Sequence, residues 1–251
     1  MDIKNDPTHF METRSYCAAL RRLQSAQKPA AGTPLYSRLV NRPLGRRLAA
    51  LSYLGGLTPN QVTCISAVFT FSAFVIIASL PPTWWMGVLV SALLVFGYAL
   101  DAADGQLARL RGGGSAQGEW LDHTVDVAKA VGLHLAILIT AYRHFELSVV
   151  WLLVPIAYAV VDSVMFSSML LKDLLAARQL GGKAPVSSAS TSLVRAIMVI
   201  PTDYGFFCLT FVLLGQPLLF FSVYVFLFAC NAIILVLVLR KWFRDMGSLP
   251  S

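Results

Sequence analysis

Charged side chains are scarce in this chain. Only 13% of its 251 residues are Asp, Glu, Lys or Arg, while 57% are hydrophobic. Soluble domains carry about 25% charged residues, so this composition excludes an ordinary soluble domain and predicts an all-α polytopic membrane protein. Acidic residues are the scarcer class, with 13 Asp and Glu against 20 Lys and Arg and a formal net charge of +7.

Cysteine is also rare, and the four cysteines show no spacing typical of a zinc site or a disulfide framework. Residues 1–33 contain no apolar core, so we expect no cleaved signal peptide. The basic residues lie beside apolar stretches and no nucleic-acid motif is present, so we expect no nucleic acid as a partner. The basic excess instead indicates a membrane surface or an anionic substrate.

Long apolar runs dominate what is present. Six stretches are long enough, or nearly so, to cross a hydrocarbon core of about 30 Å as helices. They lie near 60–80, 84–104, 120–142, 147–171, 193–214 and 217–240. The first has the clearest helix start, because Thr58 can cap it, Pro59 suits its first position and Gln61 completes a capping box.

The segments around these spans complete the expected organisation. Residues 1–33 are a polar N-terminal segment, and residues 34–57 combine leucines with arginines, which is typical of an amphipathic helix at the membrane interface. We expect this helix to be broken near Pro43. A six-helix domain at 58–245 and a tail at 246–251 follow.

The distribution of Lys and Arg predicts the orientation. These residues gather before the first span, after the last, and in two of the five connections, whereas the other three connections contain only Arg143. By the positive-inside rule, both termini are cytoplasmic. The connection between the second and third spans, and the span ends that it joins, are then cytoplasmic as well. In a bacterium, this would be the inner or plasma membrane.

Four aspartates stand out against the apolar background. Asp101 and Asp104 close the second expected span, and Asp122 and Asp126 open the third. Each pair has helical spacing and shares a face, so the four carboxylates converge if the two spans pack side by side. Carboxylates at such positions are costly and usually functional. Their oxygens suit Mg²⁺ or Mn²⁺, and a cluster of this size can hold two ions.

The residues between the two pairs suggest a substrate. Gly105 and Ala108 lack bulk and allow a ligand to approach the helix closely, and Arg109 can hold a phosphate with its planar guanidinium group. Divalent cations, small residues and an arginine together favour a substrate with a pyrophosphate.

The spacing D-x2-D-G-x2-A-R-x8-G-x3-D-x3-D, from Asp101 to Asp126, resembles the signature of the CDP-alcohol phosphotransferase family at every fixed position. The resemblance implies transfer of a phosphoryl-alcohol group from a CDP-alcohol to the hydroxyl of a polar acceptor, with release of CMP, in the synthesis of phospholipids or related polar heads. It also implies a homodimer among membrane lipids.

The same resemblance implies roles for the motif residues. Asp101, Asp104 and Asp122 would be metal ligands, and Asp126 would be both a ligand and the general base for the acceptor hydroxyl. The CDP-alcohol would be held by four residues, namely Gly105, Ala108, Arg109 and Gly118.

The substrates are left open by the sequence. Arg195 and Arg178 resemble phosphate-binding positions of the inositol-phosphate-using branch, and Lys129, one turn past Asp126, is a candidate to join them. Each of the three can also be an interfacial cation with its charge in water. The segments 36–43 and 58–63 resemble the same branch, in which the donor can be CDP-inositol rather than CDP-diacylglycerol. Inositol phosphate and glycerol phosphate are the expected acceptors.

Two other classes of protein also use intramembrane aspartates. A membrane prenyltransferase would show two separate aspartate-rich motifs and more spans. A cation-coupled transporter would distribute its charges at midplane depth and often shows repeated halves. Metal-dependent formation of CMP from a CDP-alcohol distinguishes the three hypotheses.

Overall fold

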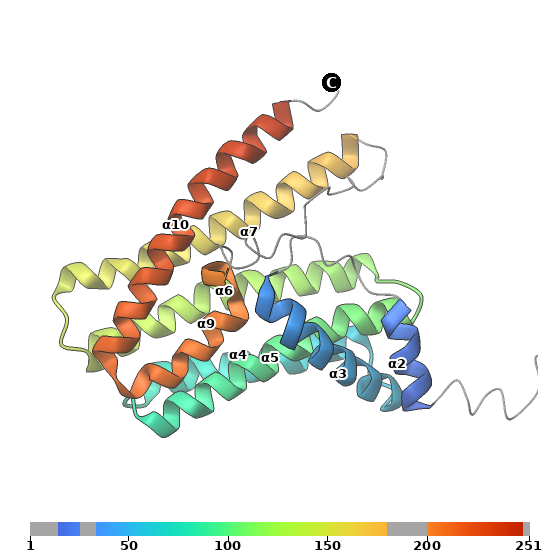
Figure 1. Cartoon of the computed structure of the whole chain (residues 1–251), viewed down its shortest axis with the longest axis horizontal. Coiled ribbons are helices and arrows are strands. Elements are labelled where there is room, and N and C mark those ends of the chain that lie inside the picture. Colours follow the sequence, from blue (N-terminus) through green and yellow to red (C-terminus); the bar gives the residue numbers. More distant parts are fainter. Residues whose placement is uncertain (1–14, 26–33, 180–199, 248–251) are drawn as a thin grey trace, which may run out of the picture.

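The computed structural model describes residues 15–25, 34–179 and 200–247, and every regular element in these ranges is a helix (Figure 1). Five of the described helices are long and apolar enough to cross a membrane, which confirms an all-α polytopic membrane protein. They are α4 (Pro59–Ser79), α5 (Trp84–Leu110), α6 (Ala116–His144), α7 (Leu153–Gln179) and α10 (Pro217–Gly247).

The expected span at 193–214 takes a different form. Its residues before 200 lie outside the described part of the chain. The rest consists of a 3-10 turn, Ile200–Thr202, then α9 (Tyr204–Thr210) and the 3-10 turn η5 (Phe211–Gly215). The last two reach about 20 Å, too little to cross a hydrocarbon core alone. The described residues therefore hold five long spans where six were expected.

The predicted helix start at Thr58 is confirmed. The Thr58 side chain accepts a hydrogen bond from the Gln61 backbone N–H at 3.3 Å, and the Thr58 backbone N–H donates to Gln61 Oε1 at 2.9 Å. Ser115 caps α6 by accepting from the Gly118 backbone N–H at 3.1 Å. These caps satisfy backbone donors that have no partner within their own helix.

Helix α4 is the platform on which the site is built. It packs against both α5 and α6, whereas α5 and α6 have little direct backbone contact. Its approach to α5 is close at Gly97, where an added Cβ would lie 2.5 Å from Thr70 Oγ1. Ser66 Oγ on α4 donates to the Gly97 carbonyl at 2.8 Å. Small residues and such hydrogen bonds hold helices together where no hydrophobic drive acts between them.

The helix break expected near Pro43 is wrong. A π-helical stretch, Ser37–Asn41, leads directly into α3 (Arg42–Leu54), with Pro43 in the first turn of α3. The wider π turn accommodates the proline ring, which in a regular helix interior would meet the carbonyl four residues earlier. As a result, α3 packs closely along α5, where an added Cβ on Gly45 would lie 2.9 Å from Ala102 Cβ.

The segment at 1–33 contains a helix that the sequence did not suggest. In its described part, α2 (Tyr16–Ser25) buries Ala19 and Leu23 in a cluster with apolar residues of α3 and α5. Arg22 Nη2 donates to the carbonyl of Leu110 at 3.4 Å, at the end of α5. The polar N-terminal segment therefore contributes to the same end of the bundle as the aspartates.

A buried polar group attaches α7 and α10 to the bundle. The His134 ring on α6 lies between Tyr224 Oη of α10, at 2.7 Å from Nδ1, and Asp162 Oδ2 of α7, at 2.9 Å from Nε2. Tyr158 stacks on the same ring, with centroids 4.3 Å apart. Hydrogen bonds of this kind join transmembrane helices.

Asp203 ties two distant parts of the chain together. Its buried carboxylate accepts from the backbone N–H groups of Tyr36, at 2.9 Å, and Ser37, at 3.3 Å, and caps α9 by accepting from Gly205 at 3.1 Å. We expect Asp203→Ala to lower the free energy of unfolding by about 2 kcal/mol, because three backbone donors lose a charged acceptor. Detergent-induced unfolding monitored by circular dichroism measures this.

The matched control for Asp203 is the exposed Glu146. The Glu146→Ala variant is expected to unfold like the unmodified protein. Equal stability of the two variants would show that the Asp203 contacts do not hold the π-helical stretch Ser37–Asn41 in place.

Candidate active site

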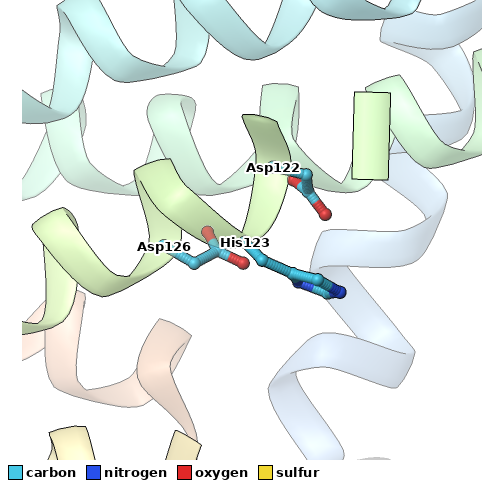
Figure 2. A group of neighbouring side chains, drawn as sticks. All are labelled: Asp122, His123 and Asp126. Atoms are coloured by element: carbon cyan, nitrogen blue, oxygen red, sulfur yellow. The ribbon is translucent and has the colours of Figure 1, made fainter. Parts of the chain in front are cut away.

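The structure brings the four aspartates into one cluster. One carboxylate oxygen each from Asp101, Asp104 and Asp122 lies within 4.8 Å of the other two, and Asp122 and Asp126 form a second group of the same size with His123. Figure 2 shows Asp122, His123 and Asp126 extending from neighbouring turns of α6 toward the same space. The four carboxylates were expected to converge if the two spans packed directly against each other. They converge instead because α5 and α6 both pack against α4.

Asp104 is the most firmly held member of the cluster. It is 5% exposed, and its carboxylate accepts from Thr63 Oγ1 and from the Gly105 backbone N–H, both at 2.5 Å. These two donors come from α4 and from the helix of Asp104 itself. They fix the orientation of the carboxylate before any ligand binds.

Lys129 provides the positive charge inside the cluster. Its ammonium group forms ion pairs with Asp101 and, at 3.4 Å, with Asp126, and it donates to Ser66 Oγ at 3.3 Å. The side chain is only 9% exposed. The three N–H groups therefore have protein partners, and their charge offsets the repulsion among carboxylates. A role in binding the acceptor phosphate stays a prediction.

The four candidate nucleotide residues lie at the same end of the bundle. An added Cβ on Gly105 would lie 3.6 Å from Arg109 Nη1, so the guanidinium group of Arg109 reaches back over Gly105. An added Cβ on Gly118 would lie 2.9 Å from Asn60 Oδ1, so a larger residue would displace the Asn60 side chain. Ala108 is half-buried one turn after Asp104.

Arg109 also faces a hollow of about 930 Å³ between α2, α3 and the end of α5. Arg22, Tyr53 and Arg111 line it as well. Arg111 donates to the Leu57 carbonyl at 2.7 Å and lies over the Tyr53 ring at 5.9 Å. Three guanidinium groups around one space are suited to a polyphosphate anion.

The other two acceptor candidates are not part of the described cluster. Arg178 is exposed near the C-terminal end of α7. Arg195 lies outside the described residues. Of the three cations proposed to bind the acceptor phosphate, Lys129 alone is placed beside the aspartates among the residues that the structure describes.

Several polar residues beside the aspartate cluster are not part of the sequence motif and were not predicted. Asn60, Thr63 and Ser66 recur every three residues along α4. Asn60 and Thr63 lie beside Gly118 and Asp104 of the signature, and Ser66 accepts from Lys129 just after it. A polar stripe with helical spacing in an apolar span was the signal that could have found them. His123 lies between the aspartates in sequence, and its ring packs edge-on against Phe166 of α7, with centroids 5.8 Å apart.

The donor set fits a hard divalent cation. The group formed by Asp101, Asp104 and Asp122 offers carboxylate oxygens from two helices that lie within 4.8 Å of one another. Oxygen-only ligands of this kind suit Mg²⁺ or Mn²⁺ rather than zinc. The second group shares Asp122 with the first and adds Asp126 and His123.

Two curated archaeal proteins are similar to part of the chain. The bifunctional IPC transferase and DIPP synthase of Archaeoglobus fulgidus is 34% identical over 109 residues, which are 43% of this chain and 21% of that protein. The archaetidylinositol phosphate synthase of Pyrococcus horikoshii is 39% identical over 90 residues, which are 35% of this chain and 43% of that protein. The chain therefore aligns with less than half of either relative.

A solved structure shares the fold. The phosphatidylinositol phosphate synthase of Mycobacterium tuberculosis, in a crystal structure with CDP-DAG bound, superimposes with a TM-score of 0.52 at 21% identity. The alignment covers 84% of this chain and 96% of that chain. The model of the CDP-alcohol phosphatidyltransferase family matches residues 56–236, which include the whole aspartate cluster and all five long helices in large part. Since this match extends over most of its length, the chain belongs to the CDP-alcohol phosphatidyltransferase family.

Proposed function

We propose that this chain transfers a phosphoryl-alcohol group from a CDP-alcohol to the hydroxyl of inositol phosphate or a related polar alcohol and releases CMP, with Mg²⁺ or Mn²⁺ as cofactor. Family membership supports the reaction class. The single observation that carries the proposal is the carboxylate cluster beside Gly105 and Arg109. Family membership also argues against the two alternative hypotheses, a prenyltransferase and a transporter.

The metal site would consist of Asp101, Asp104, Asp122 and Asp126. Bound divalent cations would neutralise the pyrophosphate and stabilise the CMP that leaves. Arg109 holds phosphate oxygens. Gly105, which has no side chain, and the small Ala108 allow the nucleotide to approach α5. Thr63 keeps the Asp104 carboxylate in its orientation.

Asp126 acts as the base in this proposal. The acceptor hydroxyl oxygen forms a bond to the phosphorus that carries the donor alcohol, and the bond from that phosphorus to the oxygen bridging to CMP breaks. The bridging oxygen leaves with the electron pair as part of CMP, and the hydroxyl proton passes to an Asp126 carboxylate oxygen. Asp126 suits this role because its side chain is 28% exposed and therefore accessible to a substrate.

The donor and acceptor are proposed from two sources. The two archaeal relatives have names that refer to IPC, DIPP and archaetidylinositol phosphate, and the resemblance of segments 36–43 and 58–63 points to the same branch. We infer CDP-diacylglycerol or CDP-inositol as donor, and Arg178 and Arg195 as further ligands of the acceptor phosphate. The Lys and Arg distribution supports a cytoplasmic site, and the family resemblance supports a homodimer.

A substrate panel tests the proposal. The purified chain is incubated with Mg²⁺, with CDP-diacylglycerol or CDP-inositol, and with inositol phosphate, inositol, glycerol phosphate or serine. We expect CMP and one phosphodiester product by mass spectrometry, with inositol phosphate the preferred acceptor and no product in EDTA. The Asp104→Asn variant is the matched inactive control. Absence of CMP with every pair of substrates, in protein that remains folded, would contradict the proposal.

A further inference from the structure

The C-terminal ends of α7 and α10 flank an open hollow that the proposed reaction does not use. Both ends lie on the same side of the molecule, beyond the body of the bundle (Figure 1). The hollow measures about 700 Å³ and is lined by residues of these two helices. On α7 its residues begin at Ser168, after Phe166, which contacts His123 beside the aspartate cluster. None of the aspartates of the cluster contributes to it.

Among the residues that the structure describes, the charged side chains that line the hollow are all cations. Lys172 comes from α7, and Arg240 and Arg244, one turn apart on α10, come from the other side. Lys172 is paired with Asp173 at 2.6 Å. Asp173 and Asp245 are not part of the described lining, so the side chains that face the hollow carry positive charge only, which favours an anion.

The walls between these cations are apolar. Leu171 is 57% exposed and Phe243 is 84% exposed, and the ammonium group of Lys172 lies over the Trp242 ring at 5.4 Å. Further exposed apolar side chains continue along both helices into the membrane-spanning parts, including Val164 on α7 and Val236 on α10. Aromatic and cationic side chains together are typical of the boundary between lipid and water.

We propose that this hollow binds an anionic glycerophospholipid of the surrounding bilayer. Its phosphate would lie beside Lys172, Arg240 and Arg244, and an acyl chain would follow the apolar stripe of α7 and α10. Cations also stabilise the C-terminal ends of helices, but that effect acts within each helix and does not require three of them around one hollow. The cations of the hollow adjoin the apolar surface of α7 and α10, just as the charged headgroup of a phospholipid adjoins its acyl chains. The site is separate from the donor site and does not depend on which CDP-alcohol reacts.

Fluorescence of Trp242 tests this proposal in the full chain. The protein is reconstituted in phosphatidylcholine bilayers that contain brominated phosphatidylglycerol or brominated phosphatidylcholine, since bromine quenches a tryptophan in contact with the lipid. Subtracting the signal of Trp242→Phe isolates the Trp242 contribution from the other tryptophans. We expect stronger quenching by the brominated phosphatidylglycerol at equal mole fraction. Preference for it should fall about fivefold for each neutralised cation in Arg240→Gln and Arg244→Gln.

The matched control is Lys241→Gln, which removes the same charge from the same helix at a position outside the lining. It is expected to leave the preference unchanged. Equal quenching by both brominated lipids would overturn the proposal, and so would absence of quenching by either, which would indicate a second copy of the chain over the hollow. If the arginine variants do not fold, a competition experiment on the unmodified protein tests the lipid preference instead. Unbrominated phosphatidylglycerol must restore the Trp242 signal where phosphatidylcholine does not.

Discussion

Replacing Asp126 by Asn is expected to lower turnover by about 10²- to 10⁴-fold, the usual contribution of a positioned general base. The amide keeps the size of the side chain but cannot accept the proton of the acceptor hydroxyl. Binding of the CDP-alcohol should be retained, because the group formed by Asp101, Asp104 and Asp122 is intact without Asp126. Steady-state turnover with a saturating acceptor measures the first quantity, and equilibrium dialysis of the labelled donor measures the second.

The control for this experiment is Glu146→Gln, at an exposed acidic residue just after the C-terminal end of α6. It should have unchanged turnover and unchanged donor binding. Near-normal turnover in Asp126→Asn would exclude Asp126 as the base. Loss of donor binding together with turnover would instead make Asp126 a ligand that the cluster requires for affinity.

Replacing Lys129 by Met is expected to lower the free energy of unfolding by about 3–5 kcal/mol in the absence of divalent cations, as when one partner of a buried ion pair is removed. Asp101 and Asp126 would lose the ammonium group that lies between them. Added Mg²⁺ or Mn²⁺ should recover much of the loss, because the ions supply positive charge to the same carboxylates. Detergent-induced unfolding in EDTA and in excess cation measures both effects.

The matched variant is Lys129→Arg, which keeps the charge and should lose less stability than Lys129→Met in EDTA. Identical unfolding of Lys129→Met and the unmodified protein in EDTA would show that Lys129 does not stabilise the cluster. A loss that divalent cations leave unchanged would show that the lysine and the ions act on different carboxylates.

Features that depend on residues close together in the chain could be predicted from the sequence. The long spans follow from hydrophobic runs, and the start of α4 follows from three residues within one turn. The spacing of Asp101, Asp104, Asp122 and Asp126 fixed which carboxylates share a helix face. All of these features depend on residues a few positions apart, and the chain itself supplies the geometry.

Contacts between distant residues decided the rest. Lys129 and Asp101 are 28 residues apart, and Tyr36 and Asp203 are 167 residues apart. No local spacing predicts that the first pair meets inside the carboxylate cluster, or that the second joins the start of the π-helical stretch Ser37–Asn41 to the start of α9. The passage of the helix through Pro43 likewise depends on a π turn, together with the packing of α3 against α5.

The aspartate cluster shows the division most clearly. The sequence by itself determined which carboxylates are present, on which helices, and the family to which their spacing belongs. Only the tertiary structure decided that α4 carries both helices, that Thr63 fixes Asp104, and that Lys129 turns inward. The physical reason is that spacing along a helix is set by its 3.6-residue repeat, whereas partners across helices are set by packing and by the need to pair buried polar groups.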